Sequence, residues 1–367
     1  MVKQLGAVGC RAYAPSFGSE KARRHGITVF RIDIGCSDTY NFFMYTTIPG
    51  YKQLHDAGIL RERAELLWKL FSSCRLCPWQ CGADRTSGQL GKCQAPGELK
   101  VAKALAHFGE EPVLSGTRGA GTIFFSHCHL QCCFCQNYQI SQEGLGEKLT
   151  VEALAQKMLS LQKAGCHNIS LVSPTHYLPH IVEALCLAAA EGLSLPLVYN
   201  SNGYESLETL KLLSGVVDIY LPDAKYANDA LAKKYSLAKD YSQINLAALK
   251  EMYAQVGPLV IDEHGIAARG LILRHLVLPE NIAGTEDVLK RIKSHLGSHV
   301  HISLMCQYLT VYKARLHPET DHRTTAAEYD RAIETLIALG FENGWLQEYE
   351  EIKGEFLPDF EKGDSWN

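Results

Sequence analysis

Apolar residues along this chain of 367 residues recur at two spacings, one typical of buried strands and one typical of amphipathic helices. Short apolar runs predict six strands, at residues 122–125, 168–172, 197–200, 216–221, 271–278 and 301–305. Helical spacing predicts helices at 50–73, 151–164, 178–191, 206–213, 285–296 and 325–339, and two more within 228–256, broken near 239–241. Thr150 and Ser206 are the expected N-caps of two of them, and a turn at 263–265 predicts a hairpin before the fifth strand.

This alternation, without a dinucleotide-binding fingerprint, predicts an α/β fold: a partial (β/α)6 barrel of the TIM type with a small N-terminal cysteine-rich module. Right-handed crossovers place the carboxyl ends of all six strands on one face, where we expect cofactor and substrate. The expected parts are an N-terminal extension (1–49), a helical lead-in with the cysteine module (50–118), the barrel core (119–310), and a C-terminal helix and tail (311–367).

Residues 1–43 show neither the helical nor the strand spacing, so we expect no regular element there. Two interpretations stay open. These residues are a genuine but poorly structured extension, disordered in the simplest case, or the natural chain starts at Met44.

A predicted strand ends directly in a cysteine-rich loop. Cys128, Cys132 and Cys135 are spaced C-x3-C-x2-C, and Phe134 precedes the last of them. Three thiolates in one loop can hold three irons of a [4Fe–4S] cluster and leave the fourth iron open to a small molecule. The alternative is a zinc site or buried structural thiols, although zinc sites normally show paired C-x2-C knuckles. Cys133 does not fit the spacing, and we expect a free thiol packed behind the loop.

A second cysteine group precedes the barrel. Cys74, Cys77, Cys81 and Cys93 are spaced C-x2-C-x3-C-x11-C. Four thiolates this close satisfy either a tetrahedral zinc or a second iron–sulfur cluster, and Pro78 after Cys77 slightly favours iron–sulfur. All coordination positions would be filled, so we expect a structural or electron-relay role and no chemistry at this site.

Polar residues mark five of the predicted strands: Ser173 to His176, Asn200 to Tyr204, Asp223 to Lys225 and Gln307 with Tyr308 at strand ends, and Arg274 with His275 within the fifth strand. Any one of them is as consistent with a turn or a satisfied core group as with function. Their convergence on one face favours a binding site. In the connecting segment 97–118, Glu110 and Glu111 stand in a predicted turn. They either touch the substrate or are solvated, and we expect both to be solvated.

Composition narrows the class of protein. The net charge is −4, so nothing indicates a basic surface that would bind a polyanion, and we expect no nucleic-acid partner. The chain has no run of about twenty apolar residues and no apolar leader at its N-terminus, so we expect no membrane partner. Thirteen cysteines in a chain this long indicate metal binding in a reducing compartment, and we predict a cytoplasmic protein.

The cysteine spacing, the aromatic residue and the preceding strand resemble the radical S-adenosylmethionine (SAM) superfamily. Over residues 50–310 the chain is similar to the uncharacterised pyruvate formate-lyase activating enzyme-like family. Matching stretches are 74–85 with 91–93, 109–112, 121–141, 167–176, 199–204, 218–226, 269–279 and 305–308. The resemblance implies that SAM chelates the open iron. One electron from the cluster then yields a 5′-deoxyadenosyl radical that abstracts a hydrogen atom.

By similarity to glycyl-radical-enzyme activases, the resemblance assigns SAM contacts to six residues: Phe134, Asn200, Asn202, Asp223, Lys225 and Arg274. One departure concerns the second strand, where many members carry Gly-Gly-Glu and this chain has Pro174-Thr175-His176. The ammonium group of SAM must then find another acceptor, either Thr175 or a backbone carbonyl.

The resemblance also implies an electron donor such as flavodoxin or ferredoxin. It leaves two substrate classes open: a glycine of a partner glycyl radical enzyme, or an unknown small molecule or peptide. An alternative of another class is a structural or electron-transfer iron–sulfur or zinc protein that never cleaves SAM. Such a protein needs neither an open iron nor the set of Asp223, Lys225 and Arg274.

Overall fold

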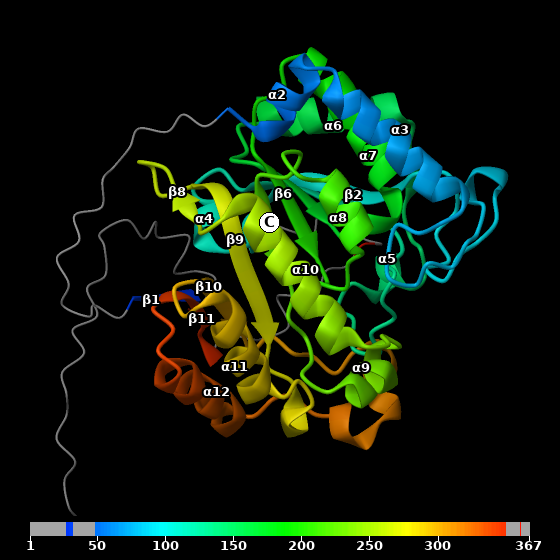
Figure 1. Cartoon of the computed structure of the whole chain (residues 1–367). Helices are drawn as coiled ribbons and strands as arrows, with labels where there is room; N and C mark the ends of the chain where they lie inside the picture. The colour runs from blue at the N-terminus through cyan, green and yellow to red at the C-terminus, as the bar shows by residue number, and fades with distance from the viewer. Residues whose placement is uncertain (1–26, 32–47, 350–359, 361–367) are drawn as a thin grey trace, which may run out of the picture.

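The computed structural model describes residues 27–31, 48–349 and 360, and Met44 lies outside them. Its centre is a sheet of parallel strands in the predicted order: β3 (Ala120–Phe125), β5 (Ile169–Val172), β6 (Leu197–Ser201), β7 (Ile219–Pro222), β9 (Ala267–Leu276) and β10 (His301–Met305). The sheet is open, because β3 and β10 do not pair with each other. The expected α/β fold, a partial TIM-type barrel, is confirmed (Figure 1).

The sheet extends beyond these six strands at both edges. β2 (Lys100–His107) pairs antiparallel with β3, and the short β4 (Glu147–Lys148) adds to β2. β11 (Asn343–Gln347) lies parallel to β10, and β8 (Val260–Ile261) forms the predicted hairpin with β9. The sequence predicts only a connecting segment at 97–118, so β2 was not predicted. Most side chains of β2 are half-buried. A half-buried strand does not require apolar residues throughout, so its sequence lacks the strong apolar pattern that marks the core strands.

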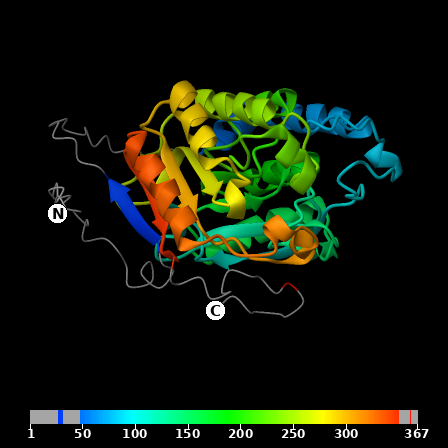
Figure 2. The same ribbon diagram turned by 90° about the horizontal axis from the view of Figure 1, so that it is seen from below.

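The N-terminal extension contains a strand that the sequence did not predict. β1 (Ile27–Arg31) pairs antiparallel with β11, so the expectation of no regular element in residues 1–43 was wrong (Figure 2). The five residues of β1 are too few to show a clear period. Its conformation depends instead on the free hydrogen-bonding edge of β11.

Helices cover the outside of the sheet, joined to the strands by short loops (Figure 1). The α-helices of the described residues are α2 (Gly50–Asp56), α3 (Ile59–Ser72), α4 (Pro112–Ser115), α5 (Tyr138–Ser141), α6 (Val151–Lys163), α7 (Leu178–Ala190), α8 (Leu207–Leu212), α9 (Asp229–Ser236), α10 (Tyr241–Val256), α11 (Thr285–Leu296) and α12 (Ala326–Ala338). The predicted break between α9 and α10 is confirmed. Thr150 caps α6 by accepting from the Ala153 N–H, whereas Ser206 precedes α8 without a side-chain capping bond.

The short helix α4 closes the amino-terminal end of the barrel. The Asn168 side chain, just before β5, donates to the Leu114 carbonyl (2.9 Å). Val113 and Leu114 pack inside the barrel with apolar side chains of β6, β7 and β9. Because this end is filled, the polar side chains of the strands gather toward the opposite, carboxyl end.

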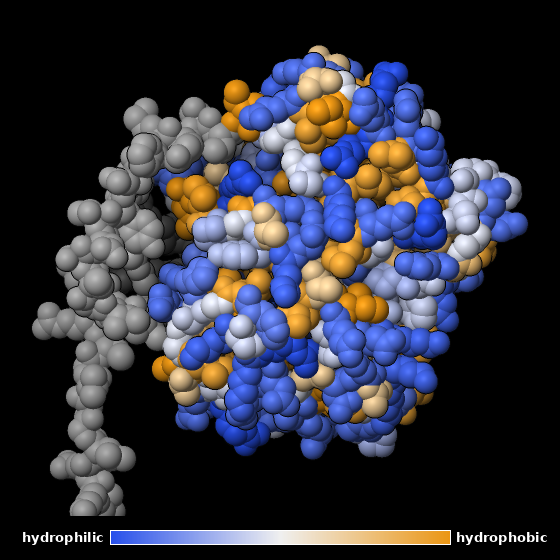
Figure 3. Space-filling view, in the orientation of Figure 1, coloured by the Kyte–Doolittle hydropathy of each residue, from blue (hydrophilic) through white to orange (hydrophobic). Residues whose placement is uncertain are grey.

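Outside the barrel, α3 packs on α7 through its buried apolar stripe, as the helical spacing predicted. The face in Figure 3 is mainly hydrophilic, with apolar residues in separate patches. Within the described part of the chain, no helix is both long enough and apolar enough to cross a bilayer.

Candidate active site

The cysteine loop after β3 lies at the carboxyl end of the strands, where the sequence placed it. Each of its three spaced thiols contacts a polar side chain: Cys128 contacts Asn202 (3.5 Å), Cys132 contacts Ser236 (3.0 Å) and Cys135 contacts Ser141 (3.1 Å). The Cys133 N–H donates to the Tyr235 carbonyl (2.8 Å), which ties the loop to the end of α9. The side chain of Cys133 is buried, as expected for a thiol packed behind the loop.

Burial controls the protonation of these thiols. It raises the pKa of Cys128 to about 12 and that of Cys135 to about 11, so both are neutral in the bare chain. Burial also raises the pKa of Cys132, although the positive charge of Lys225 acts in the opposite direction. Metal binding converts such thiols to thiolates. Three buried thiols in one loop, each beside a hydrogen-bonding side chain, therefore fit a [4Fe–4S] cluster with one iron left open.

A layer of charged side chains lies beneath this loop. Lys225 forms an ion pair with Asp223 (Nζ–Oδ2 2.5 Å) and donates its backbone N–H to the Tyr241 hydroxyl (2.9 Å). Burial favours the neutral amine, but the negative charge of Asp223 outweighs it and raises the pKa of Lys225. Lys225 is therefore positively charged beside the cluster loop.

Arg274 is held by two buried carboxylates from the segment before β3. Its guanidinium forms a bidentate pair with Glu111 (2.8 and 2.9 Å) and contacts Glu110. Asn200 donates to Glu110 at 3.4 Å, which joins β6 to the same group. Both glutamates are almost fully buried, so the expectation that they are solvated was wrong. Their partner lies more than 160 residues along the chain, and no local pattern reveals it.

Thr175, one of the two proposed acceptors for the SAM ammonium, is already occupied. Its hydroxyl donates to Glu205 (3.0 Å) and contacts the Tyr199 hydroxyl (2.9 Å) in a fully buried network. Burial raises the pKa of Glu205 to about 8, so this carboxyl is mostly protonated at neutral pH. Burial also lowers the pKa of nearby His129 to about 4, so the contact between them (3.9 Å) is not an ion pair.

The remaining strand-end residues divide into two groups. Phe134 is buried and packs against Tyr308, with ring centroids 5.6 Å apart. Asn202 accepts from the Tyr204 N–H while its amide faces Cys128. His275, in contrast, contacts the Ala224 carbonyl and the Thr285 hydroxyl of α11, which gives it a structural role outside the site.

The N-terminal cysteines also come together. Cys74, Cys77 and Cys93 are buried and Cys81 is exposed. The Cys74 N–H bonds to Ala83 O (2.9 Å) and its carbonyl accepts from the Gly82 N–H (3.0 Å), so the loop folds back on itself. Burial is the largest cause of the raised pKa of Cys74, and the charges of Cys81 and Cys93 add to it. In the described part of the chain, no three Cys, His, Asp or Glu side chains are close enough together to bind one metal ion. A cubane cluster does not require this, because each of its thiolates binds a different iron.

The two cysteine groups are connected through their neighbouring residues. Trp79, which stands between Cys77 and Cys81, donates its indole N–H to the His129 carbonyl (2.7 Å). The Gln131 amide donates to the Lys92 carbonyl (3.3 Å). Both contacts join a residue beside an N-terminal cysteine to a residue beside a cluster-loop cysteine.

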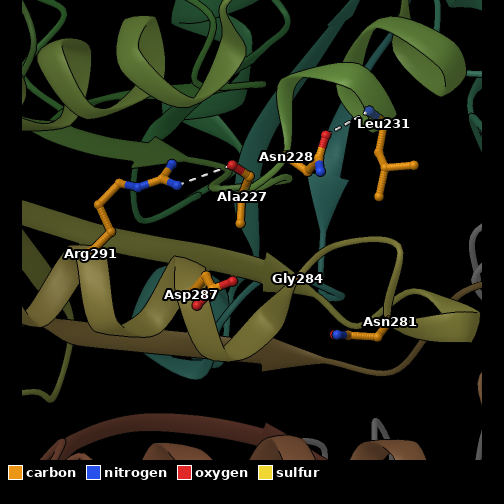
Figure 4. Close-up of a pocket in the computed structure, with 7 residues that line it drawn as sticks. All are labelled: Ala227, Asn228, Leu231, Asn281, Gly284, Asp287 and Arg291. Atoms are coloured by element: carbon orange, nitrogen blue, oxygen red, sulfur yellow. Dashed lines mark hydrogen bonds between the residues drawn. The ribbon is translucent and has the colours of Figure 1, made fainter.

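Two surface pockets lie beside the barrel. One, of about 550 Å³, lies between the start of α9 and α11, where Arg291 donates to the Ala227 carbonyl (3.1 Å) (Figure 4). Another, of about 410 Å³, lies between the N-terminal cysteine loop and α10, with Glu205 in its wall. Neither includes a cysteine, so the arrangement of the thiols and charges identifies the site better than pocket size.

Comparison with known proteins agrees with this arrangement. Residues 122–264 match the family model described as the radical SAM superfamily. The chain is 30% identical over 286 residues to the uncharacterized protein MJ0674 of Methanocaldococcus jannaschii, covering 76% of this chain and 78% of that protein.

Two solved structures are similar at low identity. One is Streptococcus suis SuiB bound to precursor peptide SuiA, with 11% identity and a TM-score of 0.40; the match covers 57% of this chain and 43% of SuiB. The other is methylornithine synthase (PylB), with 18% identity and a TM-score of 0.40; the match covers 59% of this chain and 60% of PylB. The chain thus spans less than half of SuiB and three fifths of PylB. From the family match and the archaeal relative, we conclude that the chain belongs to the radical SAM superfamily of iron–sulfur enzymes that use SAM.

Proposed function

We propose that this chain cleaves SAM reductively at a [4Fe–4S] cluster held by Cys128, Cys132 and Cys135, and that the 5′-deoxyadenosyl radical abstracts a hydrogen atom from a substrate. The observation that carries the proposal is the position of these thiols. One loop brings all three to the carboxyl end of the barrel, beside a layer of buried charges. When bound, the cluster supplies the single electron for the cleavage.

The charge of this layer supports SAM as the ligand. Glu110, Glu111 and Asp223 are acidic, whereas Lys225 and Arg274 are basic, so one carboxylate is not matched by a positive charge. SAM brings a sulfonium and an ammonium group against one carboxylate, and this net positive charge complements the layer. We assign Glu110 as the acceptor for the ammonium group, because Glu111 is paired bidentately with Arg274 whereas Glu110 contacts Arg274 through one oxygen only.

The predicted SAM contacts keep their assignments within this proposal, except that of Arg274. Asp223 and Lys225 orient the polar groups of SAM from the end of β7, and Asn200 and Asn202 contribute amides from the end of β6. The buried ring of Phe134 shields SAM from water. Arg274 acts by holding the two glutamates in place.

We propose a glycine residue of a partner glycyl radical enzyme as the first substrate to test, on the resemblance to activating enzymes. A small molecule or peptide is the alternative. A flavodoxin or ferredoxin would supply the electron. We also propose a reducing, cytoplasmic environment, because thirteen cysteines in a chain of this length are typical of metal binding in such a compartment.

We also propose that Cys74, Cys77, Cys81 and Cys93 hold a second metal centre, either an iron–sulfur cluster or zinc. The burial of three of the thiols and their mutual effect on pKa support this assignment. Iron, sulfide and zinc analysis of anaerobically purified protein decides between them, because a [4Fe–4S] centre adds about four irons and a zinc site adds one zinc.

The test of the proposed function is anaerobic reconstitution with iron and sulfide, followed by SAM, a reductant and measurement of 5′-deoxyadenosine. We expect its formation to depend on the cluster. A fully loaded protein that binds SAM but forms no 5′-deoxyadenosine would contradict the proposal. Addition of a candidate glycyl radical enzyme then tests the substrate, because activation gives a protein radical visible by electron paramagnetic resonance.

A further inference from the structure

A fully buried arginine, Arg85, lies behind the N-terminal cysteine group, with no exposed surface. One terminal nitrogen donates to the His176 carbonyl and the other donates to the Pro96 carbonyl (2.8 Å). The remaining nitrogen, Nε, is buried and has no hydrogen-bond partner among the described residues. The guanidinium lies over the ring of Phe71, 4.1 Å from its centroid.

The neighbours of Arg85 leave its charge uncompensated. Within the described ranges, no carboxylate forms an ion pair with it. His176 and His180 are nearby but neutral, because burial, aided by the charge of Arg85, lowers the pKa of both. An arginine cannot lose its proton inside a protein, and a buried charge without a partner is strongly unfavourable. This region therefore lacks a negative charge.

The cysteine group can supply that charge. The Arg85 guanidinium lies 4.1 Å from the Phe71 ring centroid and 5.6 Å from the Tyr177 ring centroid. Cys74 and Cys93 are buried in the same cluster as these two rings. Free thiols are neutral near pH 7, whereas metal-bound cysteines are thiolates. Four thiolates around one zinc ion or one oxidised [4Fe–4S] core give a net charge of about −2.

We propose that Arg85 is the counter-charge of an anionic metal centre formed by Cys74, Cys77, Cys81 and Cys93, so that metal binding completes this part of the fold. The inference rests on the metal centre proposed above and is independent of SAM cleavage.

The same arginine connects this centre to the barrel. It binds the carbonyl of His176, which lies in the loop after β5. The His176 imidazole donates to the Ser126 carbonyl (2.8 Å), immediately before the cluster loop. Metal binding at the N-terminal centre therefore stabilises the loop that carries Cys128.

The test uses the full chain with Cys128, Cys132 and Cys135 changed to Ala, so that retained metal belongs to the N-terminal centre. Arg85→Met removes the charge at similar volume, and Arg85→Lys keeps it. Arg75→Met is the control, because Arg75 is in the same segment but exposed. Metal per chain, the rate of metal loss to a chelator, and thermal unfolding of apo and loaded protein are measured for each.

Arg85→Met should release its metal roughly 10- to 100-fold faster, as expected for loss of a residue that supports a metal centre. Its apo form should unfold at the same or a higher temperature than the unsubstituted apo protein, because an unpaired buried charge is gone. Arg85→Lys should retain metal far better than Arg85→Met, and Arg75→Met should match the parent.

A purely structural role for Arg85 predicts a different pattern. Arg85→Met would then lower the unfolding temperature of apo and loaded protein equally and leave the rate of metal loss unchanged, which would overturn the inference. If Arg85→Met does not fold, Arg85→Lys still decides: rapid metal loss with the positive charge present contradicts a counter-charge role. Absence of metal from the parent protein would overturn the inference as well.

Discussion

The loop after β3 and the loop after α3 both bring cysteines together, but the side chains around them differ in charge. Around the barrel loop, Lys225 and Arg274 are paired with carboxylates, and acidic groups are in excess. Around the N-terminal group, the buried Arg85 has no acidic partner among the described residues. The first environment suits an added cation such as SAM, whereas the second suits an added anion, which a tetrathiolate metal centre provides.

The number of thiols separates the two groups further. Three spaced cysteines leave one iron of a cubane open, whereas four cysteines fill every position. In the proposals above, this difference is the reason that the barrel loop carries the chemistry and the N-terminal group supports the structure. The contacts of Trp79 with His129 and of Gln131 with Lys92 show that the two regions are nevertheless one packed unit.

The largest effect is expected at the barrel loop. Changing Cys128, Cys132 or Cys135 to Ala should abolish the low-potential cluster and SAM cleavage, because each thiol binds a separate iron. Iron content, the electron paramagnetic resonance signal and 5′-deoxyadenosine formation measure the loss. Cys133→Ala is the matched control and should retain all three. Loss of the cluster in Cys133→Ala with retention in Cys132→Ala would reassign the ligands.

The next effect concerns Arg274. Arg274→Ala leaves two buried carboxylates without their partner and should lower the free energy of unfolding by about 3–5 kcal/mol. Chemical denaturation of the protein measures this change. Arg269→Ala is the control on the same strand, because Arg269 is exposed and should cost far less. A stable Arg274→Ala variant with weakened SAM binding would instead assign Arg274 to direct contact with SAM.

A smaller, local effect is expected at Lys225. Lys225→Met should weaken SAM binding by roughly 10- to 100-fold, the range for a lost hydrogen bond to a charged group. The iron–sulfur spectrum should remain, since Lys225 is not a cluster ligand. Equilibrium binding of SAM to the reconstituted protein measures the change, with exposed Lys233→Met as control. Unchanged affinity in a folded Lys225→Met protein would remove this residue from the site.

The last effect is a change in the pH dependence of stability at Glu205, and it is spread over several pH units. Burial raises its pKa to about 8, so the folded protein holds a proton that the unfolded chain releases near its ordinary pKa of 4.5. The folded state therefore binds more protons between these values, and rising pH destabilises it by up to about 1.4 kcal/mol per pH unit. Glu205→Gln should lose this slope in denaturation measured from pH 5 to 8. The exposed Glu208→Gln should keep it, and an unchanged slope in Glu205→Gln would show that Glu205 is ionised.

The comparison also shows where sequence patterns stop being informative. The stripe of Leu60, Leu67 and Phe71 predicted the buried face of α3, because helical spacing alone selects one face. The apolar pair Val216 and Val217 extended the predicted strand too far toward the N-terminus. Both are buried in the turn after α8, before β7 begins at Ile219. A buried turn and a buried strand both favour apolar residues, so the sequence does not show that Val216 and Val217 lie in a turn.

The sequence by itself determined the order of the barrel strands, the helices between them and the spacing of both cysteine groups. These features depend on residues close together along the chain, whose periodicity or spacing is visible locally. Only the tertiary structure decided the partners of the charged residues. Glu110 contacts Arg274, which lies 164 residues away along the chain. Arg85 donates to the carbonyl of His176, 91 residues away, and pairs with no carboxylate among the described residues. Burial strengthens the electrostatic effect of these contacts, and the burial of a side chain depends on how the whole chain packs.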